Sequence, residues 1–283
     1  MKRRQFIKNV ALTSASLPFV SNGFGMQALS QKLFNFSTGA EDRVLVMIRL
    51  NGGNDGLNTV IPLDQYANLM IHRPEIIIPQ NQILSVTPEV GFHPQMQGMK
   101  GLFDQGKLSV VQNVGYPEQN RSHFRSMDIW TSGSLDVSET RGWLGRYFDS
   151  YNPNYPTGYP NVTYPDPFAI SMGSEVTATC QGIAANFSHA VSNPNNTVNL
   201  YQGGFVNDGS YYGEHVEFVG TIIEQTNSFG QVIHAAAQAG SSLSAMYDPS
   251  NNLATQLKYV AQMISGGLKT KVYVLSLGGF DTH

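Results

Sequence analysis

The sequence is poor in cysteine and in charge. Its 283 residues include one cysteine, Cys180, so a fold held together by intramolecular disulfides is excluded, and a lone cysteine is typical of a small core residue. Only 13% of the residues are Asp, Glu, Lys or Arg, and the formal net charge is -3. No block of Lys or Arg follows the first ten positions. The chain lacks the basic surface typical of nucleic-acid binding, and we expect no nucleic-acid partner.

The N-terminus is the one strongly basic stretch. In MKRRQFIKN, Arg3 and Arg4 precede apolar residues in the twin-arginine export pattern, and the modestly apolar VALTSASLPFV follows. This run is too short and too polar for a membrane anchor, and it is typical of the apolar part of a signal peptide. We predict that residues 1–40 are a twin-arginine signal peptide and leader, and that the protein is exported to the periplasm or the cell surface without a transmembrane anchor. The alternative is a basic N-terminal tail.

Three runs rich in Val, Ile and Leu predict strands. They are RVLVMIRL (43–50), KLSVVQNV (107–114) and KVYVLSL (271–277). None alternates strictly between apolar and polar residues, which is typical of strands buried on both faces of a parallel sheet. Helix and turn signals separate the first two runs, around 64–74 and 93–106, and Gly106 is suited to end the second of these helices. The order of strands and helices predicts an α/β fold.

The rest of the chain carries further helix signals. We predict helices in RSHFRSMDIWTSG, ending at Gly133, in TRGWLGRYFDSY, over about 216–245, and in NLATQLKYVAQMISGG. The apolar positions of the last helix recur at intervals of three and four: Leu253, Leu257, Val260 and Ile264. This helix should therefore cover one face of the sheet. Residues 151–215 are dense in Asn, Tyr, Pro and Gly, which predicts an irregular surface insertion around a short strand near PFAISMG.

Chemically distinctive residues follow the ends of the predicted strands. Asp55 follows the first strand within NGGNDGLN, Ser122 and its neighbours follow the second, and Asp281 and His283 form a D-x-H pair after the last. Ligands of parallel α/β sheets bind at the carboxyl ends of the strands. We therefore expect these strand ends to meet in one crevice.

Asp55, Asp281 and His283 are the candidate metal ligands. Carboxylates and a neutral imidazole suit a divalent ion, with zinc, manganese or calcium as candidates. Each assignment has an alternative. Asp55 can instead bond its own backbone in a glycine-rich turn, and a short D-x-H pair also occurs by chance.

Ser122 is the candidate nucleophile, at the predicted start of a helix. A hydroxyl there lies in the positive end of the helix dipole, although serine is also a preferred N-cap. Arg121 and Arg125 are candidates to hold phosphate or sulfate oxygens, or are solvated charges at the helix end. His123 can be a metal ligand, an acid or a packed imidazole. The histidines without a motif are assigned structural or surface roles: His72, His93, His189, His215 and His234.

The sequence resembles the domain-of-unknown-function family numbered 1501 in four successive blocks: VLVMIRLNGGNDGLNTVIPL, NRSHFRSMDIWTSG, RGWLGRYFD and LGGFDTH. The resemblance covers the chain from about residue 43 to 283, apart from the Asn/Tyr-rich middle. That family comprises exported bacterial proteins and is placed in the alkaline phosphatase-like superfamily. The resemblance implies an alkaline phosphatase-like α/β domain over 41–283, with a mostly parallel central sheet between helices and metal at the strand ends.

The resemblance also implies roles for individual residues. Asp55 matches the superfamily's metal-binding aspartate, Asp281 and His283 match an Asp/His metal pair, and Ser122 lies where the nucleophile loop enters its helix. The Cys-x-Pro-Ser-Arg core of sulfatases is absent from this sequence, so a formylglycine mechanism is not expected. The family's Ser-Glu-Phe-Gly-Arg and Asp-His-Gly blocks are also absent, and we expect a C-terminally truncated member with an incomplete metal site.

These observations predict an exported, metal-dependent hydrolase-like protein that acts on phosphate or sulfate esters of a small molecule or polysaccharide. Ser122, or a water activated by the metal, would attack the ester, and the truncated chain itself is expected to be inactive. The rival is a non-catalytic exported protein that binds a surface polysaccharide or a protein partner. A companion from the uncharacterised family numbered 1800 is one such partner.

Overall fold

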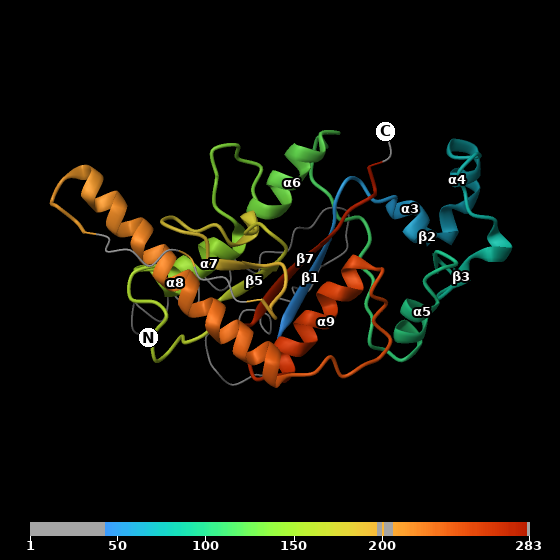
Figure 1. Cartoon of the computed structure of the whole chain (residues 1–283). Helices are drawn as coiled ribbons and strands as arrows, with labels where there is room; N and C mark the ends of the chain where they lie inside the picture. The colour runs from blue at the N-terminus through green and yellow to red at the C-terminus, as the bar shows by residue number, and fades with distance from the viewer. Residues whose placement is uncertain (1–42, 197–199, 201–205, 282–283) are drawn as a thin grey trace, which may run out of the picture.

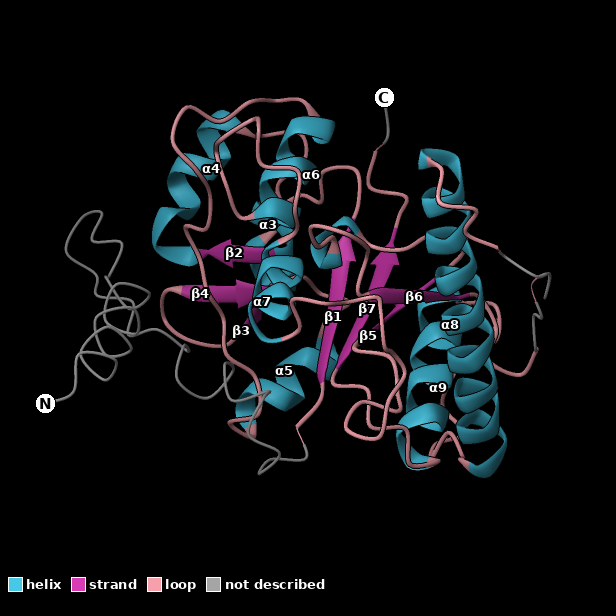
Figure 2. Cartoon of the chain, turned by 90° about the vertical axis from the view of Figure 1, so that its left-hand side faces the viewer, coloured by secondary structure: helices cyan, strands magenta, loops and turns pink. Residues whose placement is uncertain are grey.

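The structure, a computed structural model, describes residues 43–196, 200 and 206–281 (Figure 1). The predicted leader, 1–40, and the predicted ligand His283 lie outside the described residues. The fold is α/β, with a parallel four-stranded sheet flanked by helices and a smaller antiparallel sheet beside it (Figure 2). In the described ranges, no helix has the length and apolar character that a membrane crossing needs.

The main sheet contains two of the three Val-, Ile- and Leu-rich runs that were predicted to be strands, and also the short strand predicted near PFAISMG. Its order is β1 (Leu45–Leu50), β7 (Val272–Leu277), β5 (Ala169–Met172) and β6 (Ser188–Val191). All neighbouring pairs are parallel, so the carboxyl ends of all four strands lie at one edge of the sheet. The predicted strands at 43–50, at 271–277 and near PFAISMG are confirmed.

Two hydrophobic clusters cover the two faces of this sheet. Alternate residues of β7 point to opposite faces, as the pleat requires. Tyr273 and Leu275 pack in the cluster formed with α8 (Tyr211–Ala239) and α9 (Asn252–Ser265), whereas Val272 and Val274 pack with α7 (Trp143–Tyr151). Figure 2 shows α8 and α9 side by side on one flank of the sheet. Each fully buried side chain of this kind contributes about 1.5–3 kcal/mol relative to exposure.

Helix boundaries follow the capping signals in the sequence. α6 (His123–Ser132) begins after its N-cap Ser122 and ends at Gly133, which has φ 63° as a left-handed C-cap. α9 covers one face of the sheet as predicted, through the buried Val260 among others. The remaining elements are α3 (Gly56–Thr59), α4 (Tyr66–His72), α5 (Gln97–Asp104), β2 (Val60–Pro62), β3 (Leu84–Ser85), β4 (Val90–Phe92) and the short 3-10 helices Leu63–Gln65, Gln80–Gln82 and Ala178–Cys180.

The prediction of a strand at 107–114 is wrong. This segment has no strand pairing, and the side chains of Val111 and Val114 are 60% and 56% exposed. β-branched residues favour extended backbone, but a strand also needs a partner for its N–H and C=O groups. Among the described strands, β1 pairs with β7 alone and forms an edge of the sheet.

Between 151 and 215, the described residues form more regular structure and are more buried than the composition predicted. β6 lies in this range without having been anticipated, and it extends the parallel sheet. Tyr155 is 6% exposed and stacks on Phe187 with ring centroids 4.1 Å apart. Tyr-rich sequence therefore forms an aromatic core here, because ring faces bury apolar area against one another.

The long helix α8 is shifted relative to the predicted 216–245. It begins after Ser210, whose hydroxyl accepts the N–H of Gly213 at 3.0 Å, and it ends at Ala239. The next residue, Gly240, packs directly on α9, because a Cβ added there would lie 1.9 Å from the carbonyl oxygen of Gln262. A larger residue at this position would push the two helices apart.

Candidate functional site

The candidate site lies at the carboxyl ends of β1 and β7, where the sequence predicted a crevice. Two glycines that follow β1 let the chain turn with positive φ, +94° at Gly52 and +83° at Gly53. A Cβ on Gly52 would lie 2.8 Å from both the Cβ and the backbone N of Asp281. A Cβ on Gly53 would lie 3.0 Å from the ring of His123. The NGGND turn, the start of α6 and the segment after β7 therefore meet, and only glycine allows this approach.

His123 and Asp281 face each other across this crevice. The Nε2 of His123 lies 3.9 Å from the Oδ2 of Asp281, and the two side chains are 45% and 46% exposed. This separation is too long for a hydrogen bond, and a half-exposed pair of this kind contributes little to stability. The two side chains thus lie beside each other with about half of their surface open to solvent. The sequence left three roles open for His123. What indicates a functional role for His123 in the sequence is its position next to Ser122, after a predicted strand.

Ser122 caps the helix that carries His123. Its hydroxyl oxygen accepts the backbone N–H of Arg125 at 3.5 Å, and its own N–H donates to the Oδ1 of Asn120 at 2.8 Å. The capping interpretation is confirmed, whereas the nucleophile role stays a prediction. A cap uses the hydroxyl oxygen as an acceptor, so the hydroxyl proton remains available to another group.

The two candidate arginines differ in their surroundings. Arg121 is exposed at the start of α6, next to Ser122. Arg125 is half-buried, and its Nη2 donates to the carbonyl oxygen of Leu135 at 2.6 Å. Arg125 therefore fastens the turn that follows α6. Of the two, Arg121 is the better placed to bind an anion in the crevice.

Asp55 has partners on its own side of the crevice. Its carboxylate caps α3, accepts from the backbone N–H and the Nδ2 of Asn58, and forms an ion pair with Arg73. Burial alone raises the pKa of Asp55, but Arg73 and the N–H groups at the start of α3 outweigh it and hold the pKa below its ordinary value. The turn interpretation describes this geometry, and the role of Asp55 as a metal ligand stays a prediction.

A divalent ion needs several donor side chains close together. Within residues 43–196, 200 and 206–281, no three His, Cys, Asp or Glu side chains form a group spaced to hold a metal. The nearest approach is the pair His123 and Asp281, whose 3.9 Å separation suits two donors that each lie about 2.0–2.6 Å from a shared ion. Asp55 is already neutralised by Arg73. His123 and Asp281 thus have side chains of the types that bind metals, and a metal site here stays a prediction.

The structure defines an α/β protein with a parallel four-stranded sheet, and the candidate site lies at the carboxyl edge of that sheet. Comparisons with protein-family models, with curated proteins and with solved structures gave no match. The resemblance in the four sequence blocks, and the alkaline phosphatase-like fold that it implies, remain predictions.

Proposed function

We propose that the protein is an exported, metal-dependent hydrolase-like protein that acts on phosphate or sulfate esters. The observation that supports this proposal is the convergence of three chain segments, with an imidazole and a carboxylate 3.9 Å apart beside a helix N-terminus. Such a place suits an anionic ester, because helix N–H groups and a cation both stabilise negative charge.

Each residue of the crevice has a distinct proposed role. Asp281 and His123 hold a divalent ion, together with His283 and Asp55 as the further candidate ligands from the sequence. Such an ion neutralises ester oxygens and stabilises charge that develops during hydrolysis. The Oγ of Ser122 would attack phosphorus or sulfur in line, and the bond to the ester oxygen would break as the new bond forms. The alcohol would leave with the proton that the serine hydroxyl loses, and water would then cleave the seryl ester to release phosphate or sulfate and restore the serine. Arg121 binds the non-bridging oxygens.

Metal binding provides the first test. The purified full-length protein is dialysed against zinc, manganese or calcium and its metal content is measured by elemental analysis. Asp281→Asn and His123→Gln should each weaken binding by about 10- to 100-fold or more. Asp64→Asn is the matched control, because Asp64 lies in the 3-10 helix 63–65 outside the crevice. The proposal fails if the unaltered chain binds none of the three metals.

Ester hydrolysis provides the second test, with p-nitrophenyl phosphate and p-nitrophenyl sulfate as probes. In the metal-loaded full-length protein, Ser122→Ala should abolish turnover, and Arg121→Met should raise KM because it removes an anion contact. Equal turnover in the unaltered protein and Ser122→Ala would eliminate Ser122 as the nucleophile.

A second candidate, a non-catalytic binding protein, is favoured by exposed aromatic residues at the start of α8. Tyr211 and Tyr212 are 79% and 76% exposed. Paired exposed rings are suited to stack on sugar rings of a surface polysaccharide. Replacing both with alanine should abolish retention on a polysaccharide column and leave metal binding unchanged, whereas Tyr151→Ala, at a 55% exposed tyrosine of α7, should retain binding.

A further inference from the structure

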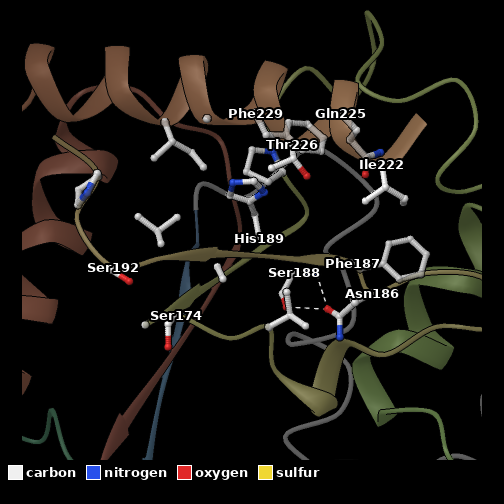
Figure 3. Close-up of a pocket in the computed structure, with 18 of the residues that line it drawn as sticks. Ser174, Asn186, Phe187, Ser188, His189, Ser192, Ile222, Gln225, Thr226 and Phe229 are labelled. Atoms are coloured by element: carbon white, nitrogen blue, oxygen red, sulfur yellow. Dashed lines mark hydrogen bonds between the residues drawn. The ribbon is translucent and has the colours of Figure 1, made fainter. Parts of the chain in front are cut away.

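A cavity of about 670 Å³ lies at the opposite flank of the main sheet, between β6 and α8 (Figure 3). Most of its wall comes from three parts of the chain: the turn 173–176 after β5, the segment 185–196 that includes β6, and one side of α8 between 222 and 233. Tyr155, Pro167 and Leu200 complete the described lining. The volume falls in the range of about 300–1,000 Å³ that is typical of small-molecule sites. β6 is the last strand in the sheet order, so the cavity lies two strands away from β7 and the crevice.

The lining of this cavity carries no formal charge at neutral pH. No Asp, Glu, Lys or Arg is among its described lining residues. The apolar part of the wall includes Phe229, Ile222 and Ile233 of α8 and Val176 after β5. A charged ligand would lose its hydration here without gaining a counter-ion, which costs several kcal/mol. The cavity therefore selects against ions of either sign.

Two amides in the lining are already used by the protein itself. The Oδ1 of Asn186 accepts from the N–H and the hydroxyl of Ser188, at 2.8 and 2.7 Å, which Figure 3 shows as dashed lines. The Oε1 of Gln225 accepts from the hydroxyl of Tyr155 at 3.0 Å. These side chains fix the shape of the wall, and their best acceptor atoms are occupied.

His189 is the only histidine among the described lining residues, and its ring is not used in this way. Its ring packs edge-on against Phe229, with centroids 6.3 Å apart and an interplanar angle of 74°. Figure 3 shows the imidazole reaching from β6 toward Thr226 and Phe229 of α8. In the described part of the chain, no side-chain hydrogen bond is formed by His189. Burial lowers the pKa of His189, so at neutral pH the imidazole offers one donor and one acceptor.

We propose that the cavity between β6 and α8 binds an uncharged small molecule with a mostly apolar body and one hydroxyl-type group, which hydrogen-bonds to His189. The apolar body packs against Phe229, Ile222 and Ile233, and the hydroxyl group satisfies the imidazole. This site is separate from the crevice at β1 and β7, and the proposal does not depend on the hydrolase function.

A matched series of probes tests the charge selection. p-Cresol is neutral, 4-hydroxyphenylacetate is an anion and tyramine is a cation, and all three carry the same phenol. Binding is measured on the metal-free chain by NMR titration. p-Cresol should bind and perturb the signals of His189 and Phe229, and both charged probes should bind at least about tenfold more weakly. Absence of p-cresol binding at millimolar concentration, or equal binding of all three probes, would overturn the proposal.

Three substitutions test the site itself. His189→Phe keeps a ring of similar size but removes the hydrogen bond, so p-cresol should bind about three- to tenfold more weakly while toluene binding is unchanged. Thr226→Phe projects a ring into the cavity and should abolish binding of both probes. His215→Phe is the control, since His215 is an exposed histidine of α8 outside the lining, and it should bind like the unaltered chain.

These substitutions still test whether ligand binds in the cavity if one of the variants folds poorly. Circular dichroism checks the folding of each variant. If Thr226→Phe does not fold, the comparison of p-cresol with toluene in His189→Phe still decides. Unchanged p-cresol affinity in a folded His189→Phe variant, or binding that survives in a folded Thr226→Phe variant, would exclude this cavity as the site.

Discussion

The two flanks of the main sheet carry two different kinds of site. The crevice at β1 and β7 is open and contains the half-exposed pair His123 and Asp281. The cavity at β6 and α8 is lined by uncharged residues, with His189 packed on Phe229. Both use an imidazole, but a carboxylate stands beside one and an aromatic ring beside the other. The carboxylate beside His123 suits that place to a cation and, through the cation, to an anionic ester. The aromatic ring beside His189 suits the cavity to a neutral molecule.

The largest expected loss of stability follows a substitution in the wall of the cavity. Phe229 is 2% exposed and belongs to the cluster under α8, so Phe229→Ala should lower the free energy of unfolding by about 3 kcal/mol, at the low end for such changes because the ring already borders a cavity. Urea unfolding measures this. Phe124, next to His123 at the crevice, is 86% exposed, and Phe124→Ala should change stability by less than about 0.5 kcal/mol. If Phe229→Ala and Phe124→Ala lowered the free energy of unfolding equally, the cavity wall would not be more tightly packed than the region around His123.

A smaller effect is expected at the turn that forms the crevice. Gly52→Ala combines an unfavourable φ of +94° with a Cβ 2.8 Å from the backbone N of Asp281, and we expect a loss of about 2–3 kcal/mol in urea unfolding. Gly56→Ala is the control, because a Cβ there meets nothing within 4 Å. It should be neutral or slightly stabilising. If both substitutions cost the same, the close approach of Gly52 and Asp281 is not a feature of the folded protein.

His189, beside the cavity, should make the stability of the protein depend on pH. Because the pKa of His189 is lowered in the folded state, the unfolded chain binds a proton at higher pH than the folded chain does. Stability is therefore fully present above the ordinary histidine pKa, and it falls as the pH drops toward the folded-state pKa, by at most about 1.4 kcal/mol per pH unit. His189→Gln should remove this part of the slope between neutral and mildly acidic pH. An unchanged slope would mean that His189 is solvated when folded.

The smallest stability effect is expected at the cap of α6. The bond from the Arg125 N–H to Ser122 is long, at 3.5 Å, so Ser122→Ala should cost only about 0.5 kcal/mol. Ser122→Asn retains a capping oxygen and should restore this stability. The same variant removes the hydroxyl, so ester hydrolysis should stay absent. Hydrolysis that returns with Ser122→Asn would show that capping, and not the nucleophile, explains the importance of this serine.

The sequence anticipated those parts of the crevice that depend on local rules. Glycines followed by Asp55 indicated a turn after a strand, and Ser122 with Gly133 marked the two ends of α6. It also anticipated that the strand end before Asp281 would meet this turn, because parallel strands place their carboxyl ends at one edge. It did not anticipate Arg73 as the partner of Asp55, since an ion pair across 18 residues leaves no periodic pattern.

By itself, the sequence determined the features that arise from neighbouring residues: the α/β class, β1, β7, and the two capped ends of α6. Periodicity and capping act within a few residues, so they can be read along the chain. Only the tertiary structure decided which extended runs found a partner, with 107–114 left unpaired and Ser188–Val191 drawn into the sheet. It alone also placed His189 against Phe229, because a cavity arises from packing between elements distant in sequence and has no local signature.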